Sequence, residues 1–197
     1  MTEFLFRHEN YIKHDDLKEF EEVMMEFDFM PETIVDLKDF GITFFFLLNL
    51  TEKAPNFIQA YEYALKMLSN TETKDTIVAI TKDFESKMFA ACFRVAEMED
   101  IFNKQVPWSW HENRPLIRGL YRCGESMWQN NEFEKANELF SKIFNTNKND
   151  NIGARYSVKA TAEKMTYNNF EKQFTILHED GSSFYNSEEL CKWFGKE

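Results

Sequence analysis

The side chains best suited to acid–base chemistry or metal binding near neutral pH are the four histidines. They are His8, His14, His111 and His178, and no two of them have the spacing of paired metal ligands. His111 is the strongest catalytic candidate, because Glu112 follows it and the two together offer the groups that a hydrolase or another ligand-binding enzyme needs. A loop histidine that is hydrogen-bonded locally is the commoner arrangement, and the sequence has no nucleophile elbow, phosphate loop or dinucleotide fingerprint. We therefore expect a protein that is not an enzyme.

Cysteine chemistry is also not indicated. Cys92, Cys123 and Cys191 are far apart, odd in number and set among apolar positions of helical spacing. They form no Cys-x-x-Cys or Cys/His pattern, so we expect neither zinc nor a disulfide framework. Buried thiols of this kind are typical of a reducing compartment. We expect no cofactor and a cytoplasmic location.

Helices must position any functional side chain of this chain, and the clearest helical pattern spans residues 116–145. Pro115 suits the first position of a helix and Asn113 can cap it. Asparagines at 130 and 131 then break the pattern with a tight turn. The apolar residues on the two sides of that turn recur every three or four positions: Leu116, Leu120, Cys123, Met127 and Trp128, then Phe133, Ala136, Leu139, Phe140, Ile143 and Phe144. The pattern predicts two antiparallel helices, the central hairpin.

The central hairpin resembles a tetratricopeptide repeat. The resemblance rests on Leu120, Gly124, Ala136 and Phe140, whose large, small and aromatic side chains follow the order of that repeat. It departs where Met127 replaces an aromatic residue, and no proline closes the repeat. Together with the runs ENRP and NDNIGARY on either side, the hairpin is similar to a group of bacterial tetratricopeptide-like proteins and to the C-terminal region of the suppressor of tumorigenicity 7 family. The resemblance covers about a quarter of the chain and implies a helical repeat fold with no known reaction.

In proteins of this repeat type, the first helix of each pair lines a concave surface. The resemblance therefore implies that Arg118, Tyr121, Glu125 and Trp128 face a groove that binds a partner. Tyrosine, tryptophan and arginine supply much of the energy of protein interfaces. The alternative is that Tyr121 and Trp128 belong to the core.

Two further arginines in the runs that flank the central hairpin are secondary candidates for a partner contact. They are Arg114 and Arg155, and the alternative for both is an ion pair or a helix-end contact that fixes one repeat on the next.

The rest of the chain reads as further helices. We predict a helix from Asp15, a second one from Pro31 that Gly41 interrupts, and a buried segment at 42–50 that is helix or strand, with helix preferred because a lone strand is unstable. Helices at 57–68 and at about 73–103 follow.

The regions at the ends of this pattern are less regular. Residues 1–14 are an extra short helix or an arm, and residues 105–114 form an aromatic loop. A degenerate repeat at 152–178 precedes a short terminal helix at 186–195 that caps the core.

Composition limits the classes of function. Six glycines and four prolines in 197 residues favour helices, and a net charge of −11 argues against nucleic acid as a partner. No apolar run is long enough to span a membrane.

We predict a single all-α domain at 1–197, built as a tetratricopeptide-like right-handed stack of antiparallel hairpins. Its expected function is to bind a protein or peptide partner in a concave groove. The alternative is a homodimer formed through the aromatic loop, and an enzyme using His111 and Glu112 is a third possibility.

Overall fold

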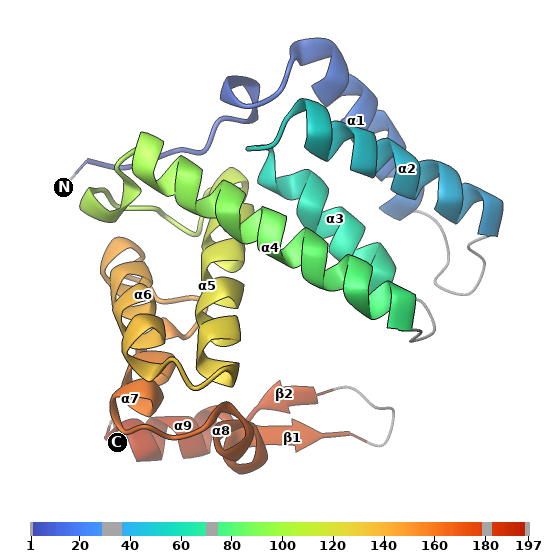
Figure 1. Ribbon diagram of the computed structural model, residues 1–197. Coiled ribbons are helices and arrows are strands. Elements are labelled where there is room, and N and C mark those ends of the chain that lie inside the picture. The colour runs from blue at the N-terminus through green and yellow to red at the C-terminus, as the bar shows by residue number, and fades with distance from the viewer. Residues whose placement is uncertain (1, 29–36, 70–74, 179–182, 196–197) are drawn as a thin grey trace.

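The computed structural model describes residues 2–28, 37–69, 75–178 and 183–195 (Figure 1). The helices have these bounds: α1 His14–Asp28, α2 Leu37–Lys53, α3 Ile58–Ser69, α4 Asp75–Met98, α5 Arg114–Gln129, α6 Phe133–Thr146, α7 Ala154–Ala162, α8 Tyr167–Phe174 and α9 Ser187–Phe194. Short 3-10 turns lie at His8–Asn10, Ile101–Asn103 and His111–Asn113, and two strands, β1 Thr175–Leu177 and β2 Ser183–Tyr185, pair antiparallel. The prediction of a predominantly helical chain is confirmed.

Helices α2 to α6 each pack on the next helix in sequence, whereas α8 packs on α5 and α9. Contacts join α2 to α3, α3 to α4, α4 to α5, α5 to α6 and α6 to α7. Figure 1 shows α1–α4 as an upper part, α5 and α6 running downward from it, and α7–α9 with the two strands at the bottom. One hydrophobic core runs through these parts, from Phe6 and Phe57 at the top to Phe140 and Phe174 below.

The central hairpin forms as predicted. Helices α5 and α6 are joined by a turn in which Asn131 adopts a positive φ of 60°, a conformation that asparagine tolerates. A Cβ on Gly124 of α5 would lie 2.6 Å from Cε1 of the Phe140 ring in α6. The absence of a side chain at Gly124 therefore lets α5 approach this ring, while Ala136 is also fully buried.

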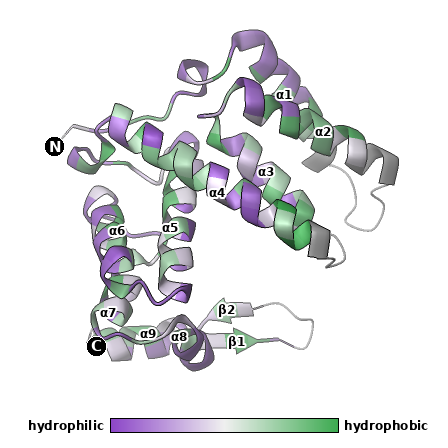
Figure 2. Ribbon diagram, viewed as in Figure 1, coloured by the Kyte–Doolittle hydropathy of each residue, from purple (hydrophilic) through white to green (hydrophobic). Residues whose placement is uncertain are grey.

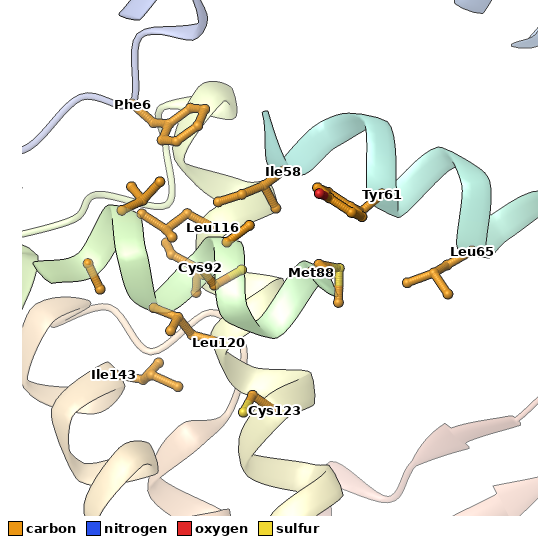
Figure 3. Packing of buried hydrophobic residues seen from close by; sticks show 14 of the residues in the cluster. Phe6, Ile58, Tyr61, Leu65, Met88, Cys92, Leu116, Leu120, Cys123 and Ile143 are labelled. Atoms are coloured by element: carbon orange, nitrogen blue, oxygen red, sulfur yellow. The ribbon is translucent and has the colours of Figure 1, made fainter. Parts of the chain in front are cut away.

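A second glycine of α5 makes a close approach that the sequence pattern did not reveal. A Cβ on Gly119 would stand 2.4 Å from the Sγ of Cys92, which is buried in α4. Figure 3 shows Cys92 between the helices, with Ile58 of α3 and Leu116 and Leu120 of α5 around it. Glycine at 119 thus lets α5 lie directly against α4.

The segment around Gly41 differs from the prediction. Residues 42–50 are helical, as preferred, but Gly41 does not interrupt a helix, because α2 runs continuously from Leu37 to Lys53. The predicted helix start at Pro31 lies outside the described residues. The expectation that this whole apolar run is buried is wrong: Leu47 and Leu50 are buried, whereas Ile42 is 61% and Phe45 69% exposed. Figure 2 shows that α1 is mostly hydrophilic and α2 more hydrophobic.

The C-terminal region is partly strand. The predicted helix of the degenerate repeat at 152–178 ends early, at Phe174, and Thr175 begins β1, which pairs with β2. The terminal helix forms as α9, with the Asn186 side chain accepting a hydrogen bond from the Glu189 N–H. Leu190 is its buried residue, and α9 packs on both α7 and α8.

Residues 2–6 form an extended arm that is fixed to the aromatic loop. The Phe4 N–H donates to the Gln105 carbonyl at 2.7 Å, and the Gln105 N–H donates to the Thr2 carbonyl at 2.8 Å. The buried Asn113 side chain accepts from the Phe6 N–H and donates to the Phe4 carbonyl. Phe4 and Phe6 are both buried, so the arm is part of the core.

Candidate functional site

Arg118, the first predicted groove residue, is engaged within the molecule. Its Nε and Nη2 donate to the two carboxylate oxygens of Glu62 in α3 at 2.8 and 2.7 Å. This bidentate pair has the strong geometry of an arginine–carboxylate bridge, although the Arg118 side chain is 44% exposed. Arg118 therefore ties α5 to α3.

Trp128 is a core residue, so the prediction that it lines a groove is wrong. The side chain is 1% exposed and its Nε1 donates to the Met165 carbonyl at 2.7 Å. Its ring also contacts Phe140, Tyr167 and Phe170 edge-on or tilted. Trp128 joins the central hairpin to α8, which explains why a large aromatic residue stands at the end of α5.

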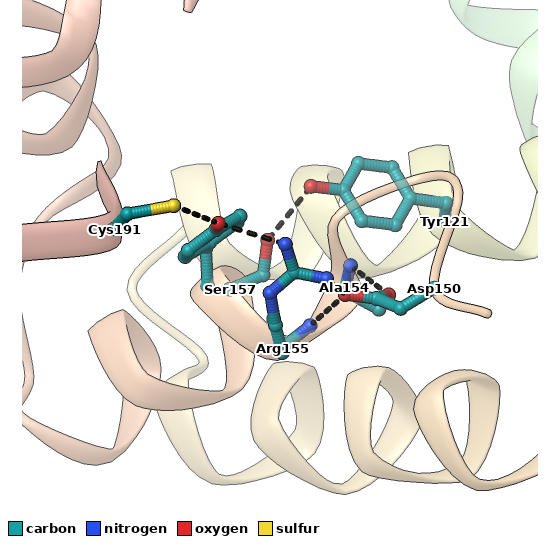
Figure 4. A network of polar contacts seen from close by, with 7 residues as sticks. Tyr121, Asp150, Ala154, Arg155, Ser157 and Cys191 are labelled. Atoms are coloured by element: carbon teal, nitrogen blue, oxygen red, sulfur yellow. Dashed lines mark hydrogen bonds and ion pairs between the residues drawn. The ribbon is translucent and has the colours of Figure 1, made fainter. Parts of the chain in front are cut away.

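Tyr121 is half-buried and contacts α7. Its hydroxyl shares a hydrogen bond of 2.7 Å with Ser157 Oγ, and burial raises the pKa of the phenol (Figure 4). The ring lies 5.1 Å from that of Phe140. Tyr121 therefore helps to dock α7 on the central hairpin. This contact favours the alternative, in which Tyr121 belongs to the packing of the fold, over a purely groove-facing role.

Arg155 also acts within the fold. Its Nη1 lies 2.8 Å from Asp150 Oδ2, and its Nη2 donates to the Tyr156 hydroxyl at 2.8 Å (Figure 4). Asp150 is buried, with a positive φ of 47°, and its Oδ1 accepts from the Ala154 N–H at the start of α7. Burial raises the pKa of Asp150 against the opposing effect of Arg155. The ion pair thus fixes the first turn of α7.

Arg114, the first residue of α5, likewise contacts the aromatic loop that precedes it. Its Nε donates to the Trp108 carbonyl at 3.1 Å, and its guanidinium lies 5.4 Å from the centre of the Trp108 ring. For both secondary candidates, Arg114 and Arg155, the structure therefore supports contacts within the fold and not a contact with a partner.

Glu125 is the groove candidate whose charge is not matched inside the fold. It lies on α5 one turn after Tyr121 and is only partly exposed. No hydrogen bond or ion pair reaches its carboxylate from the residues that the structure describes. Burial, with a smaller contribution from Glu171, raises the pKa of Glu125 to about 7, and Arg122 opposes the shift. A half-buried carboxylate without a donor is unusual, because desolvation penalises the charged form.

Besides burial, the charge of Glu125 raises the pKa of Tyr121 and Tyr167, and Glu171 raises that of Glu125. Together with Tyr185, which donates to Glu171, we call this group the Glu125 cluster. Glu171 of α8 accepts from the Tyr185 hydroxyl at 2.5 Å and from Thr175 Oγ1 at 3.1 Å. Burial, and next the charges of Glu125 and Glu171, raise the pKa of Tyr167 to about 12. The Glu125 cluster therefore comprises Tyr121, Glu125, Tyr167, Glu171 and Tyr185, drawn from α5, α8 and β2.

Sequence reasoning found two members of the Glu125 cluster, Tyr121 and Glu125, and missed the other three. Tyr167 and Glu171 belong to a segment, YNNFEKQF, that partly repeats NNEFEKANELF of α6, and the repeat could have drawn attention to them. Tyr185 carries no such signal, because it reaches Glu171 only through the reversal of the chain between β1 and β2.

His111 and Glu112 lie in an exposed 3-10 turn of the aromatic loop. Neither side chain makes a hydrogen bond or ion pair with another described residue, although the His111 carbonyl accepts from the Arg114 N–H. Throughout residues 2–28, 37–69, 75–178 and 183–195, no group of three or more histidine, cysteine, aspartate or glutamate side chains is gathered to hold a metal ion. In the same ranges, no helix has the length and apolar character needed to cross a membrane.

Comparison with known proteins adds no family to this description. No protein-family model, curated protein or solved structure matches the chain.

Proposed function

We propose that this chain is a non-catalytic interaction module, a tetratricopeptide-like helical stack that holds a segment of a partner protein across α5 and α8. In this proposal, Glu125 receives a lysine or arginine side chain of the partner. Tyr167 and Tyr185 supply aromatic contact area beside it. The single observation that carries the proposal is the half-buried Glu125 carboxylate with no donor among the described residues.

The energetics of Glu125 favour binding over a structural role. A desolvated carboxylate without a partner lowers the stability of the folded chain, and such groups are concentrated at functional sites. An ammonium or guanidinium group from a partner would satisfy the carboxylate and restore its ordinary ionisation. Each helix from α2 to α6 packs on the next one in sequence, as the helices of repeat proteins do. This packing supports a repeat-type scaffold for the surface.

The charge of the chain favours the same kind of partner. A net charge of −11 attracts basic segments from solution and speeds their association. Glu171 adds a second carboxylate beside Glu125, whereas Arg122 is the cation that opposes it.

The test is selection from a displayed library of random dodecapeptides against the pure protein, with counter-selection against Glu125→Gln. We expect enriched peptides to share a lysine or arginine at one position and to bind the variant at least about tenfold more weakly. Glu138→Gln, on the exposed face of α6, is the matched control and should leave binding unchanged. Enriched peptides that lack a basic residue, or that bind Glu125→Gln equally well, would contradict the proposal.

A further inference from the structure

A cavity on another side of the molecule, between α2 and α4, is separate from the Glu125 cluster. Its volume is about 360 Å³, at the lower end of the range of small-molecule sites. The last turns of α2, the connection to α3 and the middle of α4 line it. The principal lining residues are Leu48, Thr51, Pro55, Tyr61, Ala90 and Arg94.

Arg94 is held in a fixed orientation at this cavity. Its Nε donates to Asn56 Oδ1 at 2.8 Å, and its Nη2 donates to the Pro55 carbonyl at 2.9 Å. Nη1 makes no hydrogen bond with any residue in the described part of the chain. A guanidinium fixed along one edge keeps its remaining N–H groups oriented, so a ligand loses little entropy in meeting them.

The backbone oxygens beside Arg94 are already engaged. The Tyr61 hydroxyl lies 3.4 Å from both the Thr51 and the Pro55 carbonyl oxygens. The Thr51 carbonyl of α2 and the Pro55 carbonyl of the connection that follows it therefore face donors from within the fold.

The rest of the lining is apolar with one additional charge of each sign. Leu48, Ala90 and the buried ring of Tyr61 give the cavity a hydrocarbon surface. Lys87 also lines it and is 2.7 Å from Asp83 on its own helix, while Glu52 contributes a carboxylate. Because Asp83 pairs with Lys87 and offsets its charge, the preference for an anionic over a cationic ligand comes from the N–H groups that Arg94 has free.

We propose that this cavity binds a small amphipathic monocarboxylate. The ligand carboxylate accepts hydrogen bonds from the free edge of the Arg94 guanidinium, and its hydrocarbon part lies on Leu48 and Ala90. Arginine recognises carboxylates through paired N–H donors, and an apolar wall with few polar groups is the usual composition of a small-molecule site. The chemistry of the lining thus specifies both ends of the ligand.

The experiment uses octanoate as the probe, titrated into the full-length protein and followed by NMR of the Ala90 methyl group. We expect saturable binding, with octan-1-ol and octylammonium binding at least about tenfold more weakly. The alcohol has neither the negative charge nor the second oxygen of a carboxylate, and the ammonium group has no acceptor. Octylammonium binding as tightly as octanoate, or no saturable shift at millimolar octanoate, would overturn the proposal.

Variants that change the charge of the cavity should weaken octanoate binding in some cases and tighten it in others. A purely structural role of Arg94 would not produce that combination. Arg94→Gln should weaken octanoate binding by about tenfold or more, and Arg94→Lys by less, because the charge remains without the planar fork. Glu52→Gln should tighten binding by a few-fold, since it removes the lining anion. If Arg94→Gln unfolds the chain, Glu52→Gln still decides, and unchanged or weaker binding in that variant contradicts the proposal. Glu125→Gln should not affect octanoate binding, so this site and the peptide surface are tested independently.

Discussion

Gly119 of α5 faces Cys92 of α4 so closely that a Cβ on the glycine would stand 2.4 Å from the sulfur. The contact joins the upper helices to the central hairpin. Burial raises the pKa of the Cys92 thiol, so this group stays protonated and behaves as a small apolar side chain. The position of α5, and therefore of Glu125, depends on this approach.

Gly119→Ala should destabilise the chain although alanine favours helix. Overpacking of a buried contact costs about 1–3 kcal/mol, which exceeds the gain of about 1 kcal/mol in helix propensity at the upper end of that range. Urea unfolding followed by circular dichroism measures the change. In a Cys92→Ala background the same substitution should cost less, because the sulfur that it meets is gone.

Gly41→Ala is the matched control for that experiment. Gly41 lies within α2, and no described atom stands within 4 Å of the place where its Cβ would be. Alanine there should stabilise the chain by about 0.5–1 kcal/mol. Equal effects of the two substitutions would show that Gly119 is not a packing contact.

Gly124→Ala should separate α5 from α6. Its Cβ would lie 2.6 and 2.8 Å from two carbons of the Phe140 ring, which is fully buried and enclosed by Tyr121 and Trp128. We expect a loss of about 1–3 kcal/mol in the free energy of unfolding. Phe140→Leu should relieve part of the clash, and a double-mutant cycle without any coupling between the two sites would contradict the described packing.

Trp128→Ala should strongly destabilise the fold. It removes a buried indole and leaves the Met165 carbonyl without its donor, so the expected loss is about 3–5 kcal/mol. Trp128→Phe should lose less, because it retains most of the ring contacts. If Trp128→Ala melted at the same temperature as the parent chain, the conclusion that Trp128 is a core residue would be contradicted.

Glu125→Gln should stabilise the chain at high pH and have little effect at low pH. The folded-state pKa of about 7 lies above the ordinary value of 4.5, so folding favours the protonated acid. The parent chain therefore loses stability as pH rises from 4.5 through 7, and the uncharged variant does not. At pH 8 the variant should be more stable by up to about 3 kcal/mol.

Glu138→Gln is the control for this pH dependence. Glu138 is fully exposed, and the hydrogen bond from Lys142 lowers its pKa, so its removal should give no gain at pH 8. A similar gain in both variants would indicate a general effect of the net charge.

Local sequence signals were sufficient for the central hairpin and the terminal helix. Pro115, the turn at Asn131 and the cap at Asn186 act within one or two helical turns, so their effects can be predicted without the fold. The continuation of α2 through Gly41 could not be predicted in the same way. One glycine costs a helix only about 1 kcal/mol, and contacts of the flanking residues can offset that.

The candidate site was only partly predictable, because its members meet through tertiary contacts. Helical spacing places Trp128 at the border between the core and the predicted groove, and only the docking of α8 shows that it is buried. Glu171 and Tyr185 come together through the pairing of β1 with β2, which the helical pattern up to Leu177 did not indicate. The spacing on α5 was enough to identify Glu125 but could not show that it lacks a partner.

The ionisation of Glu125 tests the proposed function most directly. Carbon-13 NMR of the glutamate carboxyl groups, assigned with Glu125→Gln, follows its titration with and without a saturating basic peptide from the display selection. We predict a pKa of about 7 in the free protein and a value at least one unit lower in the complex, with peptide binding about tenfold weaker at pH 6 than at pH 8. A pKa near 4.5 in the free protein, or a pKa that the peptide leaves unchanged, would contradict the assignment of Glu125 as the receptor for a partner's cation.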